Sequence, residues 1–183
     1  MVRLFVAIEL PEEICRQFFD VQTALRSSRA RLSLVDQDSM HITLKFIGEV
    51  SGSLLPQITS VLQAINSPPF SMEVGLIGTN SQKAPRVVWA EVDDHGPCRA
   101  LAAEIDSSLG TLGIEPEKRK FRPHITIARV RRHHQSLFEA LAEVAASCSG
   151  TIYAREFVLK KSELTPGGPI YTDILRVPLK ENS

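Results

Sequence analysis

The chain has 183 residues, 43% hydrophobic and 23% charged, which is an ordinary composition for a globular protein. Its 21 basic and 21 acidic side chains cancel, which argues against a protein that coats long nucleic acid through a global basic field. No apolar run approaches the roughly 20 residues of a membrane span, and three scattered cysteines without a C-x-x-C pair predict small buried thiols. We expect a soluble, cytoplasmic protein that forms a single bilobal domain over residues 1–183.

In the first half of the chain, segments with a period of 2 alternate with segments with a period of 3.6. The run RLFVAIEL predicts a strand over residues 3–10, and Pro11 followed by two glutamates predicts the start of a helix. That helix would bury Ile14, Phe18, Val21 and Leu25. The next predicted elements are strands at 31–35 and 41–48, a helix at 53–66, and a strand pair at 70–78 and 86–92.

The second half repeats this style. Its predicted elements are a helix at 96–109, a strand at 124–130, a helix at 135–148, and strands at 151–164 and 170–179. Strand pairs joined by short turns favour antiparallel or mixed sheets over a doubly wound parallel sheet. We therefore expect an α+β fold of two pseudo-symmetric lobes, each an antiparallel or mixed sheet with packed helices, around a central cleft.

The tripeptide His-Ile-Thr occurs twice, 83 residues apart, in the runs MHITLKFIGEV and PHITIARV. Because residues i and i+2 of a strand share a face, His41 should project with Thr43, and His124 with Thr126. The side chains of alternate parity should point into the core. They are Ile42, Leu44 and Phe46 in the first copy, and Ile125 and Ile127 in the second. An internal pseudo-twofold axis would bring the two motifs face to face across the cleft.

Two imidazoles and two hydroxyls around one point suit the cleavage of a phosphodiester. One neutral imidazole would deprotonate an attacking water, and one imidazolium would protonate the leaving oxygen, since histidine titrates near neutral pH. The threonine hydroxyls would donate to non-bridging phosphate oxygens. This layout requires no metal and no other cofactor. A pair of structural histidines, or a zinc site completed by a ligand from elsewhere, stays open as an alternative.

The motifs and their flanks resemble the 2H phosphoesterase superfamily, and within it the RNA 2′,3′-cyclic phosphodiesterases, also called the 2′-5′ RNA ligase family. The resemblance runs through RLFVAIELPEE, HITLKFIGEV, RVVWAEV and FRPHITIARV and so covers nearly the whole chain. It implies metal-independent hydrolysis of RNA or nucleoside 2′,3′-cyclic phosphate ends to 2′-phosphomonoesters, with reversible 2′-5′ ligation. It also implies that His41 is the proton donor, that His124 is the proton acceptor, and that Thr43 and Thr126 hold phosphate oxygens.

Five further side chains are candidate substrate ligands. Arg122 has the strand parity of His124, whereas Arg129 has the opposite parity and could pair with a buried carboxylate instead. Phe5 and Tyr171 could stack on a base or ribose, although packing in the core is an equal alternative for Phe5. Lys45 should lie on the face of His41 and add positive charge to the cleft.

Other functions remain open from the sequence. They are a non-catalytic module that binds RNA ends, a metal-dependent hydrolase, and a 2H enzyme acting on another cyclic nucleotide or a 2′-5′ oligonucleotide. The expected partner is an RNA 3′ end or a small cyclic nucleotide. We expect the protein to be a monomer that binds no membrane and no metal. The turn TPGGP lacks the spacing of a phosphate-binding loop, so no nucleoside triphosphate site is expected.

Overall fold

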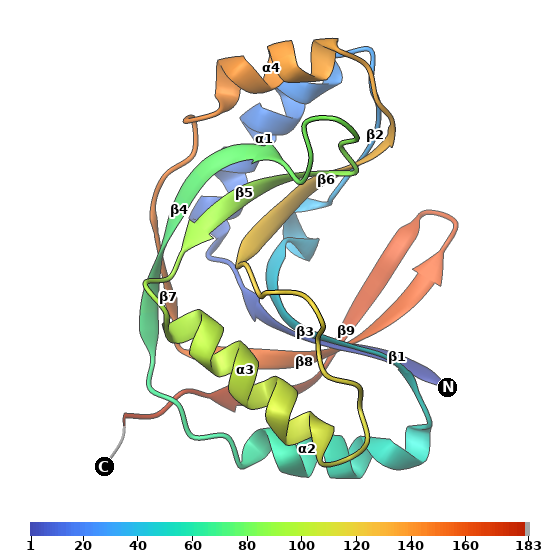
Figure 1. Ribbon diagram of the computed structural model, residues 1–183, viewed down its shortest axis with the longest axis vertical. Coiled ribbons are helices and arrows are strands. Elements are labelled where there is room, and N and C mark those ends of the chain that lie inside the picture. The colour runs from blue at the N-terminus through green and yellow to red at the C-terminus, as the bar shows by residue number, and fades with distance from the viewer. Residues whose placement is uncertain (182–183) are drawn as a thin grey trace.

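The structure, a computed structural model, describes residues 1–181 (Figure 1). Its strands are β1 (Val2–Glu9), β2 (Arg31–Leu34), β3 (His41–Val50), β4 (Phe70–Thr79), β5 (Val87–Asp93), β6 (His124–Arg132), β7 (Thr151–Ala154), β8 (Glu156–Thr165) and β9 (Gly168–Pro178). Its α-helices are α1 (Glu12–Arg26), α2 (Leu55–Gln63), α3 (Pro97–Gly110) and α4 (Ser136–Val144). No helix within this range is both long and apolar enough to cross a membrane.

The described strands form one curled antiparallel sheet in the order β7-β4-β5-β6-β3-β1-β8-β9, and β2 also pairs with β6. At the centre of the sheet, β3 and β6 meet through the single residue pair Ile42↔Ile125. That pair joins two half-sheets, one made of β3, β1, β8 and β9 and the other of β6, β5, β4, β7 and β2. The chain therefore has the predicted α+β fold, with its two half-sheets continuous through hydrogen bonds.

The helices pack in two pairs at opposite ends of the molecule (Figure 1). Helix α1 contacts α4 and β6, whereas α3 contacts α2 and β3. Helix α1, which follows β1, contacts β6 of the other half-sheet, and α3, which follows β5, makes most of its strand contacts with β3 of the other half-sheet. The stripe predicted for α1 is buried at Ile14, Phe18, Val21 and Leu25. This crossed arrangement is a pseudo-twofold symmetry between the two lobes.

Two predicted elements differ most from the observed ones. The strand predicted over 151–164 is two strands, because at Arg155 the chain passes from β7, which pairs with β4, to β8, which pairs with β1. Apolar and polar residues alternate in the same way in β7 and β8. The periodicity of the sequence therefore cannot show that the chain passes from one half-sheet to the other. The helix predicted over 135–148 ends earlier, at Val144. All three cysteines are buried and unpaired, as predicted.

Candidate active site

The two His-Ile-Thr motifs begin the adjacent central strands β3 and β6, whose buried isoleucines are register partners. In an antiparallel pair, the residues on either side of a paired position meet in opposite order. The register therefore sets His41 beside Thr126, and it sets His124 beside Thr43. These four half-buried side chains lie opposite the isoleucines, on what we call the motif face. The motifs thus lie side by side in one sheet, instead of facing each other from two.

Both imidazoles are oriented by the backbone carbonyl two residues upstream. Nδ1 of His41 lies 2.7 Å from the carbonyl oxygen of Ser39, and Nδ1 of His124 lies 2.8 Å from that of Arg122. A carbonyl oxygen only accepts hydrogen bonds, so Nδ1 of each ring carries the hydrogen. Nε2 of each ring is then the atom available for proton transfer.

A β-bulge reverses the alternation of β3 just after the first motif. Leu44 has no register partner on β1, although Thr43 and Lys45 on either side of it do. Leu44 and Lys45 are consequently both buried, and the parity of the strand is inverted from Lys45 until a second irregularity at Ile47, which also lacks a register partner on β1.

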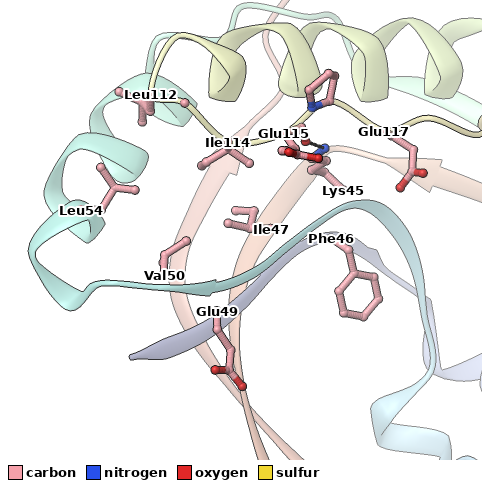
Figure 2. Close-up of a pocket in the computed structure, with 12 residues that line it drawn as sticks. Lys45, Phe46, Ile47, Glu49, Val50, Leu54, Leu112, Ile114, Glu115 and Glu117 are labelled. Carbon is pink, nitrogen blue, oxygen red and sulfur yellow. Dashed lines mark hydrogen bonds between the residues drawn. The ribbon is translucent and has the colours of Figure 1, made fainter.

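The prediction that Lys45 shares the face of His41 is wrong for this reason. Figure 2 shows Lys45 and Phe46 on opposite sides of β3. The Lys45 ammonium donates to the carbonyl oxygen of Glu115 at 2.7 Å and pairs with Asp106 of α3. Its charge is therefore already neutralised on the helix side of the sheet, and the residue that faces the motif side is Phe46.

The second motif contains an equivalent bulge, at Ile127, which lacks a register partner on β5. Ile127 and Ala128 are both fully buried, so the exposed Arg129 takes the position that Phe46 holds in the first motif. Burial raises the pKa of Tyr171, and the positive charges of Arg129 and Arg3 oppose that rise. The alternative that Arg129 pairs with a buried carboxylate is wrong, because no ion pair within residues 1–181 includes it.

Aromatic rings surround His41. The Phe5 ring centroid lies 4.9 Å from that of His41, 5.0 Å from that of Tyr171 and 5.7 Å from that of Phe46. Phe5 is only 1% exposed, so it supports His41 from below and has no open face for a base. The expectation that Phe5 stacks on substrate is corrected accordingly. The open aromatic surface is instead Phe46, which is 48% exposed and has the Arg3 guanidinium 5.9 Å from its ring centroid.

Trp89 of β5 lies against the other histidine, with 4.6 Å between its ring centroid and that of His124. Trp89 is half-buried. The Arg122 guanidinium lies 6.0 Å from the Trp89 ring centroid and 3.3 Å from the carboxylate of Glu91. Arg122 therefore lies at the margin of the motif face, beside His124. Its strand parity with His124 was the signal that located it.

An ionic cluster joins β1, β8 and β9. The buried Lys160 ammonium donates to Glu9 at 2.6 Å and to Asp173 at 2.5 Å. Arg176 binds the same two carboxylates and also Glu156. Burial by itself would raise the pKa of Glu9 and of Asp173, but hydrogen bonds and charge from Lys160 and Arg176 lower both on balance. The cluster therefore stays charged at neutral pH.

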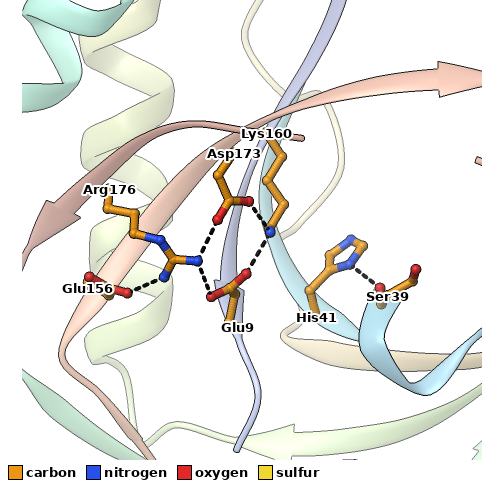
Figure 3. Close-up of polar contacts among 7 residues, drawn as sticks. All are labelled: Glu9, Ser39, His41, Glu156, Lys160, Asp173 and Arg176. Atoms are coloured by element: carbon orange, nitrogen blue, oxygen red, sulfur yellow. Dashed lines mark hydrogen bonds and ion pairs between the residues drawn. The ribbon is translucent and has the colours of Figure 1, made fainter. Parts of the chain in front are cut away.

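The cluster lies next to His41, because Glu9 is the register partner of His41 (Figure 3). Burial lowers the pKa of His41 from its ordinary 6.5, and the charges of Lys160, His124 and Arg129 lower it further. The hydrogen bond to the Ser39 carbonyl opposes this shift without reversing it. In the free protein the neutral form of His41 is therefore favoured.

The motif face thus gathers two imidazoles with available Nε2 atoms, two hydroxyls, a guanidinium and aromatic rings. Such a set can transfer protons and hold an anionic phosphate. Of the nine predicted site residues, the structure brings eight together at or beside this face and places Lys45 on the other. Phe46 and Trp89 also lie at this face, but the sequence did not predict them as site residues. Within residues 1–181, no three His, Cys, Asp or Glu side chains gather as a candidate metal site.

Comparisons with known proteins agree with this fold. RNA 2′,3′-cyclic phosphodiesterases of Methanothermobacter thermautotrophicus and Archaeoglobus fulgidus are 33% and 32% identical to the chain, over 94% of it and 96% and 98% of their own lengths. The crystal structure of TT0787 of Thermus thermophilus has a TM-score of 0.80 at 27% identity, covering 97% of both chains. Escherichia coli LigT complexed with 3′-AMP has a TM-score of 0.79 at 27% identity, covering 98% of this chain and 99% of that one.

The fold and the two H-x-T-x motifs define the chain as a phosphodiesterase-type hydrolase of the 2H class. The family model of the 2′-5′ RNA ligase superfamily matches residues 10–159. The chain belongs to this superfamily, as its sequence resemblance predicted.

Proposed function

We propose that the chain hydrolyses 2′,3′-cyclic phosphate ends of RNA, or of nucleosides, to 2′-phosphomonoesters. The observation that carries the proposal is the register of β3 and β6, which gathers two histidines and two threonines on one face. Both histidines keep Nε2 for proton transfer. The names of the curated relatives support this choice of substrate. Residues 1–183, taken as one bilobal domain, contain every group that the reaction uses.

In the proposed reaction, His124 takes a proton from water as the water attacks phosphorus. His41 gives a proton to the 3′-oxygen as the P–O3′ bond breaks, so the phosphate remains on the 2′-oxygen. Thr43 and Thr126 donate to the non-bridging oxygens, where negative charge sits in the transition state. The family resemblance assigns the donor and the acceptor, since the two motifs are nearly identical.

The lowered pKa of His41 bears on its role as a donor. A donor must be protonated, so the free protein holds only part of its His41 in the reactive form near neutral pH. A bound cyclic phosphate is an anion, and an anion beside an imidazole favours the imidazolium. Substrate therefore promotes the protonation that the mechanism needs. The same groups run in reverse would join RNA ends through a 2′-5′ linkage.

Product identity tests the proposal. Adenosine 2′,3′-cyclic phosphate, and an oligoribonucleotide that ends in a cyclic phosphate, should both yield the 2′-phosphate, separated from the 3′-isomer by chromatography and identified by mass spectrometry. The rate should be unchanged in EDTA. Binding without turnover would instead support a module that binds RNA ends, and loss of the reaction in EDTA would support a metal-dependent hydrolase. A 3′-phosphate product would contradict the proposed direction of ring opening.

Arg129→Gln should raise KM for the cyclic phosphate about 10- to 100-fold. The guanidinium faces the motif side and has no ion-pair partner among residues 1–181, and a hydrogen bond to a charged group contributes about 1.5–3 kcal/mol. The matched control is Arg131→Gln on the same strand, whose exposed side chain donates to Ser33 at 2.9 Å. Steady-state kinetics should show KM unchanged in the control. An equal change in both variants would point to a general loss of basic charge.

A further inference from the structure

The β8–β9 hairpin extends beyond the part of the sheet that carries the two motifs. Lys161 is the last residue of β8 that pairs with β1, and from Ser162 onward β8 pairs only with β9. The Thr165 hydroxyl donates to the carbonyl oxygen of Gly168 at 2.6 Å and closes the turn. The tip of the hairpin projects away from the four α-helices (Figure 1). This segment is therefore a two-stranded ribbon, and the hydrolytic reaction itself makes no use of it.

One face of the ribbon continues the motif face. Lys160 is the register partner of Phe5, whose ring packs against His41, so the Lys160 side chain lies on the motif side. Alternate residues of β8 share this side with their register partners on β9. The ring centroid of Tyr171 accordingly lies 5.5 Å from that of His41. Beyond Lys160 and Asp173, this side of the ribbon carries four side chains, which we call the inner strip: Ser162, Leu164, Pro169 and Tyr171.

The inner strip is uncharged, and it becomes more exposed toward the turn. Tyr171 is half-buried, whereas Pro169 is exposed and the Leu164 side chain is 70% exposed. The opposite face of the ribbon differs, because it carries the ion pair of Lys161 and Glu163. An exposed apolar surface next to a site is typical of a surface that a ligand covers. The strip has no charged group to hold a phosphate, so it suits the uncharged part of a nucleotide, which is the base.

The inner strip is longer than one base requires. Leu164 and Pro169 are register partners, as are Ser162 and Tyr171. The first pair lies two residues, or about 6.6 Å, farther along the ribbon than the second. Bases stacked along one nucleic-acid strand are only about 3.4 Å apart. A base that lies against Tyr171 therefore leaves Leu164 and Pro169 free for the base of the next nucleotide.

A positive charge lies where the inner strip meets the motif face. Arg3 is two residues before Phe5 on β1, so it projects on the motif side, and the pairing of Phe5 with Lys160 directs it toward the strip. Within residues 1–181 no ion pair includes Arg3, whose guanidinium lies 5.9 Å from the Phe46 ring centroid. A guanidinium in this location can bind the phosphate that joins two nucleotides.

We propose that the inner strip binds the base of the nucleotide that precedes the one carrying the cyclic phosphate. The inference deepens the proposed function and rests on it, because it makes an oligoribonucleotide end a better substrate of the same site than a free cyclic mononucleotide. Single-stranded RNA is bound elsewhere by the same division of labour, with bases on side-chain surfaces and cationic side chains along the phosphates.

The experiment isolates the upstream base. The substrates are adenosine 2′,3′-cyclic phosphate, an adenosine dinucleotide that ends in the same cyclic phosphate, and that dinucleotide without its first base. We define the base ratio as kcat/KM for the complete dinucleotide divided by kcat/KM for the abasic one. These two substrates have the same phosphates and the same reacting nucleotide. The base ratio should be about 5- to 50-fold in the wild type, the usual contribution of one stacked base.

Two variants of the ribbon test which face binds the base. Leu164→Ser should lower the base ratio about three- to tenfold, the factor that corresponds to losing a few tens of Å² of apolar contact. The matched control is Ile170→Ser. Ile170 is 56% exposed and lies on the opposite face, because its register partner is Glu163. Ile170→Ser should therefore leave the base ratio at its wild-type value.

Three outcomes would overturn the inference. The first is a wild-type base ratio near 1. The second is a Leu164→Ser variant that lowers kcat/KM equally for all three substrates, since the strip would then hold the reacting nucleoside. The third is a Leu164→Ser variant that dissociates a dimer in size-exclusion chromatography without changing the base ratio, which would make the strip an interface between copies of the chain.

Failure of the proposed function would look different. In each of these three outcomes, the cyclic mononucleotide still yields its 2′-phosphate. If the proposed function is wrong, none of the three substrates is opened to a 2′-phosphate, whichever variant is used.

Discussion

His41→Ala and His124→Ala are each expected to lower kcat for a nucleoside 2′,3′-cyclic phosphate by about 10²- to 10⁴-fold, the usual contribution of one general acid or base. Each ring is the only imidazole of its motif and is oriented through Nδ1 by a backbone carbonyl oxygen. Initial rates measured at saturating substrate would give the loss directly. Circular dichroism would show that both variants keep the fold.

A histidine away from the motif face provides the matched control. His133 is exposed and its ring packs edge-on against Phe138 of α4, so His133→Ala should keep full activity. Full activity in either motif variant would falsify the paired-histidine mechanism. Equal losses in all three variants would indicate a general effect of removing imidazole.

The pH dependence of the two motif variants separates the donor from the acceptor. A donor loses activity as pH rises through its pKa, and the pKa of His41 lies below its ordinary 6.5 because of burial and nearby positive charges. The wild-type kcat/KM should therefore follow a bell whose alkaline limb begins on the acid side of neutrality. The alkaline limb should disappear in His41→Ala, measured on the residual activity. If the acid limb disappeared in His41→Ala instead, His41 would be the proton acceptor and His124 the proton donor.

Lys160→Met is expected to destabilise the fold by about 2–3 kcal/mol, which corresponds to a fall in Tm of roughly 4–12 °C for a chain of this size. Lys160 is 8% exposed and bridges Glu9 and Asp173, so its loss leaves these two carboxylates with only the more exposed Arg176 as a shared cation. Breaking a fully buried pair costs more, but these carboxylates are about one third exposed, and solvent reduces the cost. Thermal unfolding followed by circular dichroism would measure it.

The adjacent lysine is the control. Lys161 pairs with the exposed Glu163 at 2.9 Å, so Lys161→Met should change Tm by less than about 2 °C.

The pKa of Glu9 and that of Asp173 are lowered in the folded state, so the stability they contribute is present above their ordinary values of 4.5 and 3.8 and is lost at more acidic pH. The difference between Lys160→Met and wild type should therefore shrink near pH 3. A difference that persists there would show that lost packing, and not lost charge, is the cause.

Several features of the fold could be predicted from local pattern. The amphipathic stripe of α1 was found because burial repeats every 3.6 residues whatever the helix packs against. The strands β3 and β6 were found because their apolar residues alternate. The two histidines and two threonines followed from the same alternation, since i and i+2 share a face within a strand that is still regular.

Positions beyond the bulges could not be predicted in this way. One unpaired residue, Leu44 in β3 or Ile127 in β6, inverts the facing of the residues that directly follow it, and such a residue has no local signature. This explains both errors in the first motif, where Lys45 and Phe46 exchanged sides. It also explains why Arg129, whose parity in a regular strand is opposite to that of His124, faces the motif side.

The sequence by itself determined the chemistry of this protein, because the type and spacing of the residues in each His-Ile-Thr strand specify an imidazole and a hydroxyl on one face. The tertiary structure decided how these groups combine. The register Ile42↔Ile125 placed each histidine beside the threonine of the other motif. Ion pairs between distant strands placed a charged cluster beside His41. These decisions depend on contacts between residues far apart in the chain, which no local pattern encodes.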